Sequence, residues 1–290
     1  MPHAIGINHW GMAMFERFSR SWELVKASAN VLRSDRELLL FPLISGLCTL
    51  VVMATFLVPV FALRIFENGI GIGGAVVGFL FYFCQYSVII FFNCALVAAA
   101  MIRLDGGDPT LRDGFDAAKS KLPAILGYAA IAATVGVALQ ALKSRDNNFI
   151  VRLVGSGLGV AWTLATFMVV PVLVSRNIGP VDALKQSVAL LKRTWGENAI
   201  GNVGIGAAFG LITFAVMLVG AGLAFLAWQA SPMLAIAVAV VFVIGVLLLG
   251  IYQAALSGIY SAALYRYAVS HETPAAFQGM QLESAFQPKR

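Results

Sequence analysis

The 290-residue sequence is 60% hydrophobic and only 12% charged, with a formal net charge of +6. Soluble domains are nearer half apolar and a quarter charged, so this composition excludes an ordinary soluble fold and predicts an all-α integral membrane protein. Because the basic residues flank apolar stretches, we attribute the positive charge to membrane topology and anionic headgroups, and expect no nucleic-acid partner.

The first 40 residues form a basic segment ahead of the first long apolar stretch. Within it, apolar residues such as Phe15, Phe18 and Trp22 recur at spacings of three or four, which predicts an amphipathic helix. The apolar stretch that follows begins too late and is too long for a cleaved signal peptide. We therefore expect it to remain in the protein as a membrane anchor.

Six stretches are long and apolar enough to span a bilayer, which takes about 20 residues. They cover residues 41–63, 75–102, 122–142, 153–175, 199–228 and 232–265. Pro42, Pro123 and Pro232 open three of the spans, where a missing N–H is not needed. Pro59 and Pro171 lie deeper and predict kinks.

The loops after the second and fourth spans each predict a further amphipathic helix. Asp108 is the expected N-cap of the first helix, and Pro180 the expected start of the second. We expect these helices to lie in the cytoplasmic membrane interface with the apolar face towards lipid. Trp22 and Trp195 would serve as interface anchors.

Most of the 20 Lys and Arg residues fall in the N-terminal segment, in these two loops and at the C-terminus. The positive-inside rule places those segments, and thus both termini, in the cytoplasm. The chain then reads as a six-helix bundle built from three parallel repeats, each an interfacial helix followed by a transmembrane hairpin. We expect one transmembrane domain over residues 1–268 and a short cytoplasmic tail over residues 269–290.

The stretches FSRSWELVK (residues 18–26) and VLRSDRELLLFP (residues 31–42) resemble the opening of a bacterial multi-pass membrane-protein family, a domain of unknown function. The resemblance covers most of the chain, to about Ala268, and implies a bacterial inner-membrane protein. More loosely, the alternation of interfacial helix and hairpin resembles the membrane domain of glycerophosphodiester phosphodiesterases. Since this chain has no room for their catalytic barrel, the resemblance implies no activity.

No catalytic, cofactor-binding or metal-binding motif is expected. The three histidines lie outside the spans, without a partner at metal-ligand spacing. The strongest enzymatic candidate is an acidic cluster formed by Asp105, Asp108, Asp113 and Asp116. Carboxylates at a membrane surface could hold Mg²⁺ against a phosphate headgroup, as in lipid phosphotransferases. We favour the alternative, in which these residues form a turn, a cap and the wet face of a helix.

Polar residues inside the spans raise the alternative of a transport path. The candidates are Gln85, Asn93, Thr163, Thr166, Tyr252 and Gln253. Hydrogen bonding between helices is the competing interpretation. No acidic or basic residue lies at mid-span, which argues against coupling to protons or ions through a charged group.

Small residues recur every fourth position on the last two spans and predict close helix packing. They are Gly206, Gly210, Gly250, Ala254, Gly258 and Ala262. The packing partner is either another helix of the same chain or a second copy in a homo-oligomer.

Three functions remain open. The first is a non-enzymatic membrane protein that binds lipid or a membrane partner through its interfacial helices. The second is a transporter or channel for a neutral or amphipathic, lipid-like molecule. The third is a lipid-modifying enzyme that uses the Asp105–Asp116 cluster.

Overall fold

The computed structural model describes residues 26–62, 72–144, 149–195 and 204–270, and in these ranges the secondary structure is helical, with turns and no strand. The described part contains six helices long and apolar enough to cross a membrane. A helix of 20 residues rises about 30 Å, which matches the hydrocarbon core of a bilayer. The chain is therefore a multi-pass α-helical membrane protein by composition and architecture.

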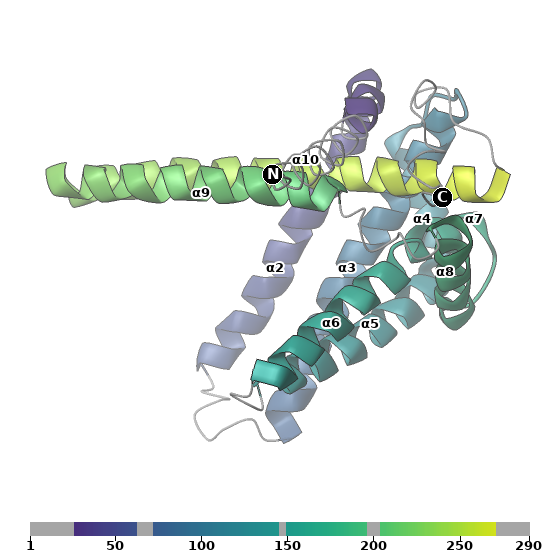
Figure 1. The fold of residues 1–290 in the computed structure, drawn as a ribbon, viewed down its shortest axis with the longest axis horizontal. Coiled ribbons are helices and arrows are strands. Elements are labelled where there is room, and N and C mark those ends of the chain that lie inside the picture. Colours follow the sequence, from purple (N-terminus) through teal and green to yellow (C-terminus); the bar gives the residue numbers. More distant parts are fainter. Residues whose placement is uncertain (1–25, 63–71, 145–148, 196–203, 271–290) are drawn as a thin grey trace, which may run out of the picture.

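Four long helices form one packed group, which we call the four-helix group (Figure 1). Its members are α2 (Leu40–Ala62), α3 (Ile72–Leu104), α5 (Leu122–Ser144) and α6 (Phe149–Thr166). Helix α3 is central, since it packs against α2, α5 and the C-terminal part of the last helix, while α6 packs against α5. The bounds of α2, α3 and α5 follow the predicted spans to within a few residues, because apolar run length and the prolines at helix starts define both. Helix α6, in contrast, ends at Thr166, well before the predicted end at Ser175.

The fourth predicted span is broken rather than kinked. Helix α6 ends at Thr166, and the chain resumes as α7 (Val169–Ser175) after a turn at Phe167 and Met168. Pro171 explains the break, because it has no N–H to donate to the carbonyl four residues earlier and its ring crowds that carbonyl. In the new helix Pro171 lies in the first turn, where proline is tolerated.

Short helices gather at the end of the group where α2 starts and α3 ends (Figure 1). They comprise residues 26–34, the 3₁₀ helix η1 (Arg36–Leu39), α4 (Leu111–Ser120) and α8 (Pro180–Trp195). The expectation that Asp108 caps α4 is wrong. Thr110 is the N-cap, in a reciprocal capping box with Asp113.

The amphipathic helices α4 and α8 turn their apolar faces towards protein. In α4, Gly114 and Ala118 are buried, and the ring of Phe115 lies 5.4 Å from Phe41 and 5.8 Å from Phe92, centroid to centroid. In α8, Ala183 and Ser187 are fully buried. Much of the apolar surface that we expected to meet lipid is thus covered by the spans themselves.

The last two helices depart from the predicted six-helix bundle. Helix α9 (Gly204–Ala230) pairs with the first half of α10 (Pro232–Ser270). In Figure 1 this pair runs across the direction of the four-helix group and projects beyond it. We call α9 together with residues 232–250 of α10 the arm. Only the second half of α10 is embedded in the core, around Leu256, Ile259 and Leu264.

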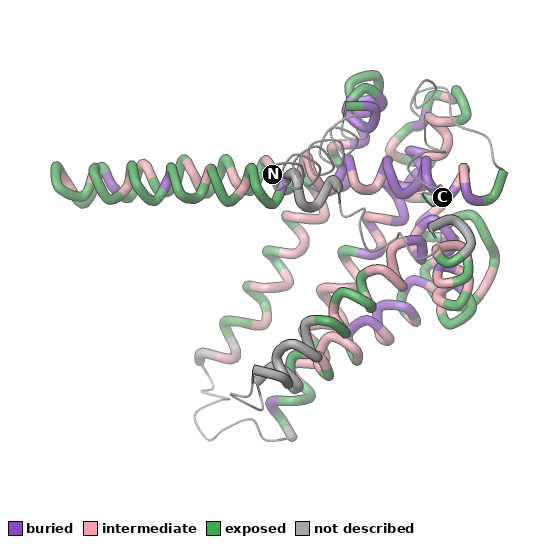
Figure 2. Tube along the Cα trace, viewed as in Figure 1, coloured by how far each residue is buried: buried purple, intermediate pink, exposed green. Residues whose placement is uncertain are grey.

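The two helices of the arm pack closely at one glycine, and most large apolar residues of the arm are exposed. A methyl group on Gly220 would lie 2.6 Å from the ring of Phe242, so only glycine allows this approach of α9 to α10. Figure 2 shows exposed residues along nearly the whole arm. They include Leu218, Phe225, Met233 and Leu247, of which Met233 retains 82% of its accessible surface.

Candidate functional site

The described structure collects its polar interactions at the end of the four-helix group that carries the short helices. Segments far apart in the sequence meet there: the N-terminal helix of residues 26–34, the α3–α4 loop, the α7–α8 loop and the C-terminal part of α10. These are the segments whose Lys and Arg content predicted a common, cytoplasmic side. We call this region the polar end.

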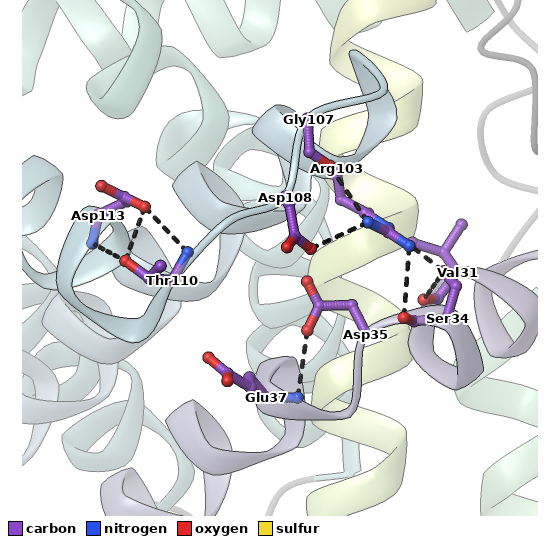
Figure 3. Close-up of polar contacts among 9 residues, drawn as sticks. All are labelled: Val31, Ser34, Asp35, Glu37, Arg103, Gly107, Asp108, Thr110 and Asp113. Atoms are coloured by element: carbon purple, nitrogen blue, oxygen red, sulfur yellow. Dashed lines mark hydrogen bonds and ion pairs between the residues drawn. The ribbon is translucent and has the colours of Figure 1, made fainter.

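Arg103, at the C-terminal end of α3, connects two of these segments (Figure 3). Its guanidinium donates to the Ser34 carbonyl at 3.3 Å and to the Ser34 hydroxyl at 3.4 Å. It also donates to the Gly107 carbonyl at 3.2 Å and to the Asp108 carboxylate at 3.3 Å. A planar guanidinium with several donors suits such bridging, because it can serve acceptors on both sides at once.

Three further basic side chains connect the other segments of the polar end. Arg266 on α10 forms an ion pair with Asp105 of the α3–α4 loop. Lys121 donates to the Arg176 carbonyl at 3.2 Å, and the Arg176 side chain donates to the Tyr265 hydroxyl at 3.4 Å. The polar end is thus crosslinked by charge-assisted hydrogen bonds between residues distant in the sequence.

Each member of the acidic cluster has a structural partner. Asp105 pairs with Arg266, and Asp108 pairs with Arg103. Asp116 pairs with Arg112 at 3.4 Å and with Lys119 at 3.7 Å on the exposed face of α4. Within the described residues, no three His, Cys, Asp or Glu side chains converge as metal ligands would. The arrangement favours the turn, cap and wet-face interpretation of this cluster over a Mg²⁺ site.

Asp113 is bound into the cap of α4. Its carboxylate accepts from the Thr110 hydroxyl at 2.7 Å and from the Thr110 N–H at 2.9 Å. These two bonds lower the pKa of Asp113 below its ordinary value, because they favour the charged form, and Arg112 adds a smaller effect.

The polar residues proposed for a transport path lie on three helices. Gln85 and Asn93 are half-buried on α3, and Tyr252 and Gln253 are half-buried on α10. Thr163 donates to the Gly159 carbonyl at 2.9 Å and Thr166 to the Trp162 carbonyl at 2.8 Å, both within α6. Thr166 also forms a side-chain hydrogen bond with Tyr128 of α5. Among the described residues, the buried Gln85 Oε1 has no hydrogen-bond partner.

A residue that the sequence analysis missed forms hydrogen bonds with the backbone at the break between α6 and α7. The buried Ser187 hydroxyl of α8 donates to the Ala165 carbonyl at 2.6 Å and accepts from the Met168 N–H at 3.1 Å. It thereby satisfies two backbone groups that the proline-induced break would leave without partners. The only signal for this role in the sequence is the combination of Pro171 with a serine on the apolar face of the next helix.

Of the predicted packing residues, those near the C-terminus of α10 meet another helix. A methyl group on Gly258 would lie 2.4 Å from Leu96 Cδ2 of α3, and Ala262 is fully buried. Gly250 and Gly210 face open space, because they lie on the arm. The surroundings of Gly206, the side chain of Trp195 and all of Trp22 lie outside what the structure describes.

One comparison with known proteins identifies a relationship. Among curated proteins none matches the sequence. A family model described as a family of unknown function, DUF6159, matches residues 72–275. The match starts at α3 and extends beyond the end of α10, so it includes the centre of the four-helix group, the arm and most of the polar end. The chain belongs to this family of unknown function.

Proposed function

We propose that the chain is a non-enzymatic multi-pass protein of a bacterial inner membrane that acts by binding lipid or another membrane protein. The observation that carries the proposal is the arm. It presents a long apolar surface that the other described residues of the chain do not cover.

The arm surface fits acyl chains in its chemistry and in its size. Its exposed residues are almost all apolar on both helices, and α9 is roughly 40 Å long at 1.5 Å per residue. In water such a surface would lead to aggregation, whereas in lipid it has no such cost. The arm is therefore the element that we expect to contact lipid tails or an apolar helix of a partner.

The polar end supports an orientation in which the short helices face the cytoplasm. Its basic side chains include Arg103, Lys121, Arg176, Lys185 and Arg266, on three of the four segments that the positive-inside rule assigns to the cytoplasm. Both termini would then be cytoplasmic, and the exposed basic residues would face anionic headgroups. The order of elements, a short helix before each of three helix pairs, supports the parallel repeat.

The direction of the arm is difficult to reconcile with a flat bilayer that all six helices span. A flat bilayer spanned by α2, α3, α5 and α6 cannot also be crossed upright by helices that run across them (Figure 1). We propose that the arm swings towards the membrane normal in a bilayer, so that all six apolar helices span. The adjustment requires α10 to bend between the arm and its embedded half, near Gly250, where an added Cβ would meet nothing within 4 Å.

Depth-dependent quenching tests the proposal. A variant that lacks Cys48, Cys84 and Cys94 is labelled with an environment-sensitive dye at Leu218, Leu247 or Met233, and quenched in vesicles by lipids brominated at shallow or deep acyl positions. Leu47 on α2, 64% exposed, is the spanning control, and Lys192 on α8 is the aqueous control. We expect deep quenching at Leu218 and Leu247 and shallow quenching at Met233, the arm tip. Equal shallow quenching at all three would contradict a spanning arm, and no quenching at any would contradict lipid contact.

A transporter for a neutral or amphipathic molecule is the second candidate. Two observations favour it: the discontinuous helix α6–α7, a feature that transporters use near binding sites, and the orphaned Gln85 Oε1. Single cysteines at Gln85 and Asn93 would react with a membrane-impermeant thiol reagent if a hydrated path reached them. Failure to react at both positions would favour the first proposal.

A further inference from the structure

Helix α10 crosses α3 on one particular side of α3, which continues beyond the crossing towards the start of that helix. At the crossing, Gly258 packs against the fully buried side chain of Leu96. The positions of α3 that continue on the same side as Leu96 are Ile89, Gln85, Tyr82 and Gly78. We call these four positions the α3 strip. Ile89 retains 36% of its accessible surface, and a Cβ added to Gly78 would meet no described atom within 4 Å.

The neighbouring helices border the α3 strip on its two sides. Phe81 contacts Phe56 of α2, with ring centroids 5.6 Å apart. The Tyr86 hydroxyl lies 3.3 Å from the position of a Cβ on Gly136 of α5. At 3.6 residues per turn, Phe81 and Tyr86 point about 60° and 80° away from the Leu96 direction, to opposite sides. Helices α2 and α5 therefore flank the strip and leave a position for a further helix between them.

Helix α10 has a matching apolar face that no described residue covers. From Gly258 towards the arm, Ile244 and Val240 lie on the same side of the helix, within about 40° of the Gly258 direction. Each retains 51% of its accessible surface. Phe242 points to the opposite side, where it packs against Gly220 of α9. Helix α9 thus covers the back of α10, and the face that continues its contact with α3 is left exposed.

The spacing on the two helices is the same. Val240 precedes Gly258 by eighteen residues, and Gly78 precedes Leu96 by eighteen residues, about five helical turns in each case. Both helices run towards the polar end. Laid parallel from the existing contact, they would place Val240 against Gly78, and a glycine opposite a larger side chain allows close packing in membranes.

The bend that the arm requires lies close enough to α3 for this arrangement. Gly250 precedes Gly258 by eight residues, or about 12 Å along the helix. Packed helices lie about 8–10 Å apart between their axes. An arm that turns away from the polar end at Gly250 would therefore come to lie beside α3, and not at a distance from it.

We propose that the arm, once it spans the bilayer, docks on the α3 strip with Val240 against Gly78 and covers the strip between α2 and α5. The inference rests on the proposed swing of the arm and names the surface that receives it. The contact continues the interface that α10 already forms with α3 at Leu96. Residues of the arm that point away from α3, such as Leu218 and Phe225 on α9, stay available to lipid.

The test uses disulfide formation in the full-length protein in lipid vesicles. The starting variant lacks Cys48, Cys84 and Cys94. The test pair is Gly78→Cys/Val240→Cys, and the matched control is Gly78→Cys/Val241→Cys. Val240 and Val241 are both exposed, but neighbouring residues of a helix point about 100° apart. After oxidation with copper phenanthroline, free thiols are tagged with a maleimide polymer in denaturant, and the products are separated without reductant.

We expect the test pair to yield an untagged monomer, because both thiols are consumed within one chain, and the control pair to keep both tags. A disulfide requires Cα atoms closer than about 7 Å. Tyr82→Cys/Ile244→Cys is a second pair in the same register, since each residue lies fourteen positions before the crossing. Tagged monomer with both test pairs, or equal cross-linking of the test and control pairs, would overturn the proposal. A cross-linked dimer would also overturn it, because a second copy would then occupy the strip.

Failure of this inference is distinguishable from failure of the proposed function. Leu218, which lies on α9 and stays exposed to lipid after docking, reports by quenching depth whether the arm spans. Deep quenching at Leu218 without a cross-link would mean that acyl chains cover the α3 strip, and would overturn the docking alone. Shallow quenching at Leu218 would contradict the spanning arm itself, and the docking with it.

Discussion

Gly258 provides the sharpest test of how α10 is anchored. Gly258 lies on the face of α10 that contacts α3. A methyl group added at this position would lie 2.4 Å from Leu96 Cδ2 and 3.0 Å from Leu96 Cγ. Leu96 is itself fully buried, so its side chain has little freedom to move away. Replacement by alanine should therefore push α10 away from α3.

The magnitude follows from comparing two glycines on the same helix. Gly258→Ala and Gly250→Ala both gain the helix propensity of alanine over glycine, about 1 kcal/mol in soluble hosts. Only Gly258→Ala overfills a packed contact, which typically costs about 1–3 kcal/mol. Because the propensity gain is common to both, Gly258→Ala should be less stable than Gly250→Ala by roughly the overpacking cost.

Thermal unfolding in detergent, followed by the loss of the monodisperse peak, would measure this difference. The double variant Gly258→Ala/Leu96→Ala completes a double-mutant cycle, which measures the interaction energy between the two positions. Leu96→Ala alone should destabilise by about 2–5 kcal/mol through its cavity, and the added methyl group at position 258 should be tolerated in its presence. If Gly258→Ala matched Gly250→Ala in stability, or if the effects of the two substitutions were simply additive, the close contact between α10 and α3 would be refuted.

Three further predictions concern the polar end and the broken helix. Ser187→Ala should lower the free energy of unfolding by about 1–3 kcal/mol, because the Ala165 carbonyl and the Met168 N–H lose their partner; the exposed Ser120→Ala should show no such loss in the same melt. Thr110→Ala should cost about 1 kcal/mol by removing the N-cap of α4, and should also weaken the acid sensitivity due to Asp113. Since the Asp113 pKa is lowered, its contribution is present above the ordinary value of 3.8 and is lost as pH falls through the lowered value, so a pH series of melts with an unchanged acid limb would contradict that cause. Arg266→Ala, which removes a half-exposed ion pair with Asp105, should cost less than about 1 kcal/mol; a larger loss in the same assay would show that this pair does more than join two surface segments.

The spans were predictable because the signal is local and accumulates along the chain. Twenty apolar residues in succession have few alternatives to a membrane helix, and Pro123 and Pro232 mark helix starts by their own stereochemistry. The turn at Phe167 and Met168 was anticipated as a kink at Pro171. Its sharpness was not, because Ser187 on another helix makes a full break tolerable.

The arrangement of the helices was not predictable from the same signal. Helices that are apolar on all sides carry no periodic mark of which face packs. The ladder from Gly250 to Ala262 predicts close approach along its whole length, yet only its second half, from Gly258 onward, meets α3. The crossing direction of the arm depends on that difference, which the sequence pattern does not contain.

The apolar faces of the short helices illustrate a second ambiguity. An amphipathic pattern shows that one face avoids water, but lipid and protein satisfy it equally well. In α4 the apolar face is occupied by Phe41, Phe91 and Phe92 around Phe115. The sequence pattern could not predict the hydrogen bonds between Arg103 and Ser34, since the two residues lie 69 positions apart in the sequence.

Side-specific cysteine labelling tests the central claim most directly: that the chain spans a membrane with its polar end in the cytoplasm. In a variant without Cys48, Cys84 and Cys94, single cysteines are placed at Ser120, the last residue of α4, and at Ser144, the last residue of α5. We predict that a membrane-impermeant thiol reagent labels Ser120→Cys only from the cytoplasmic side and Ser144→Cys only from the outside. Labelling of both positions from the same side would contradict the account.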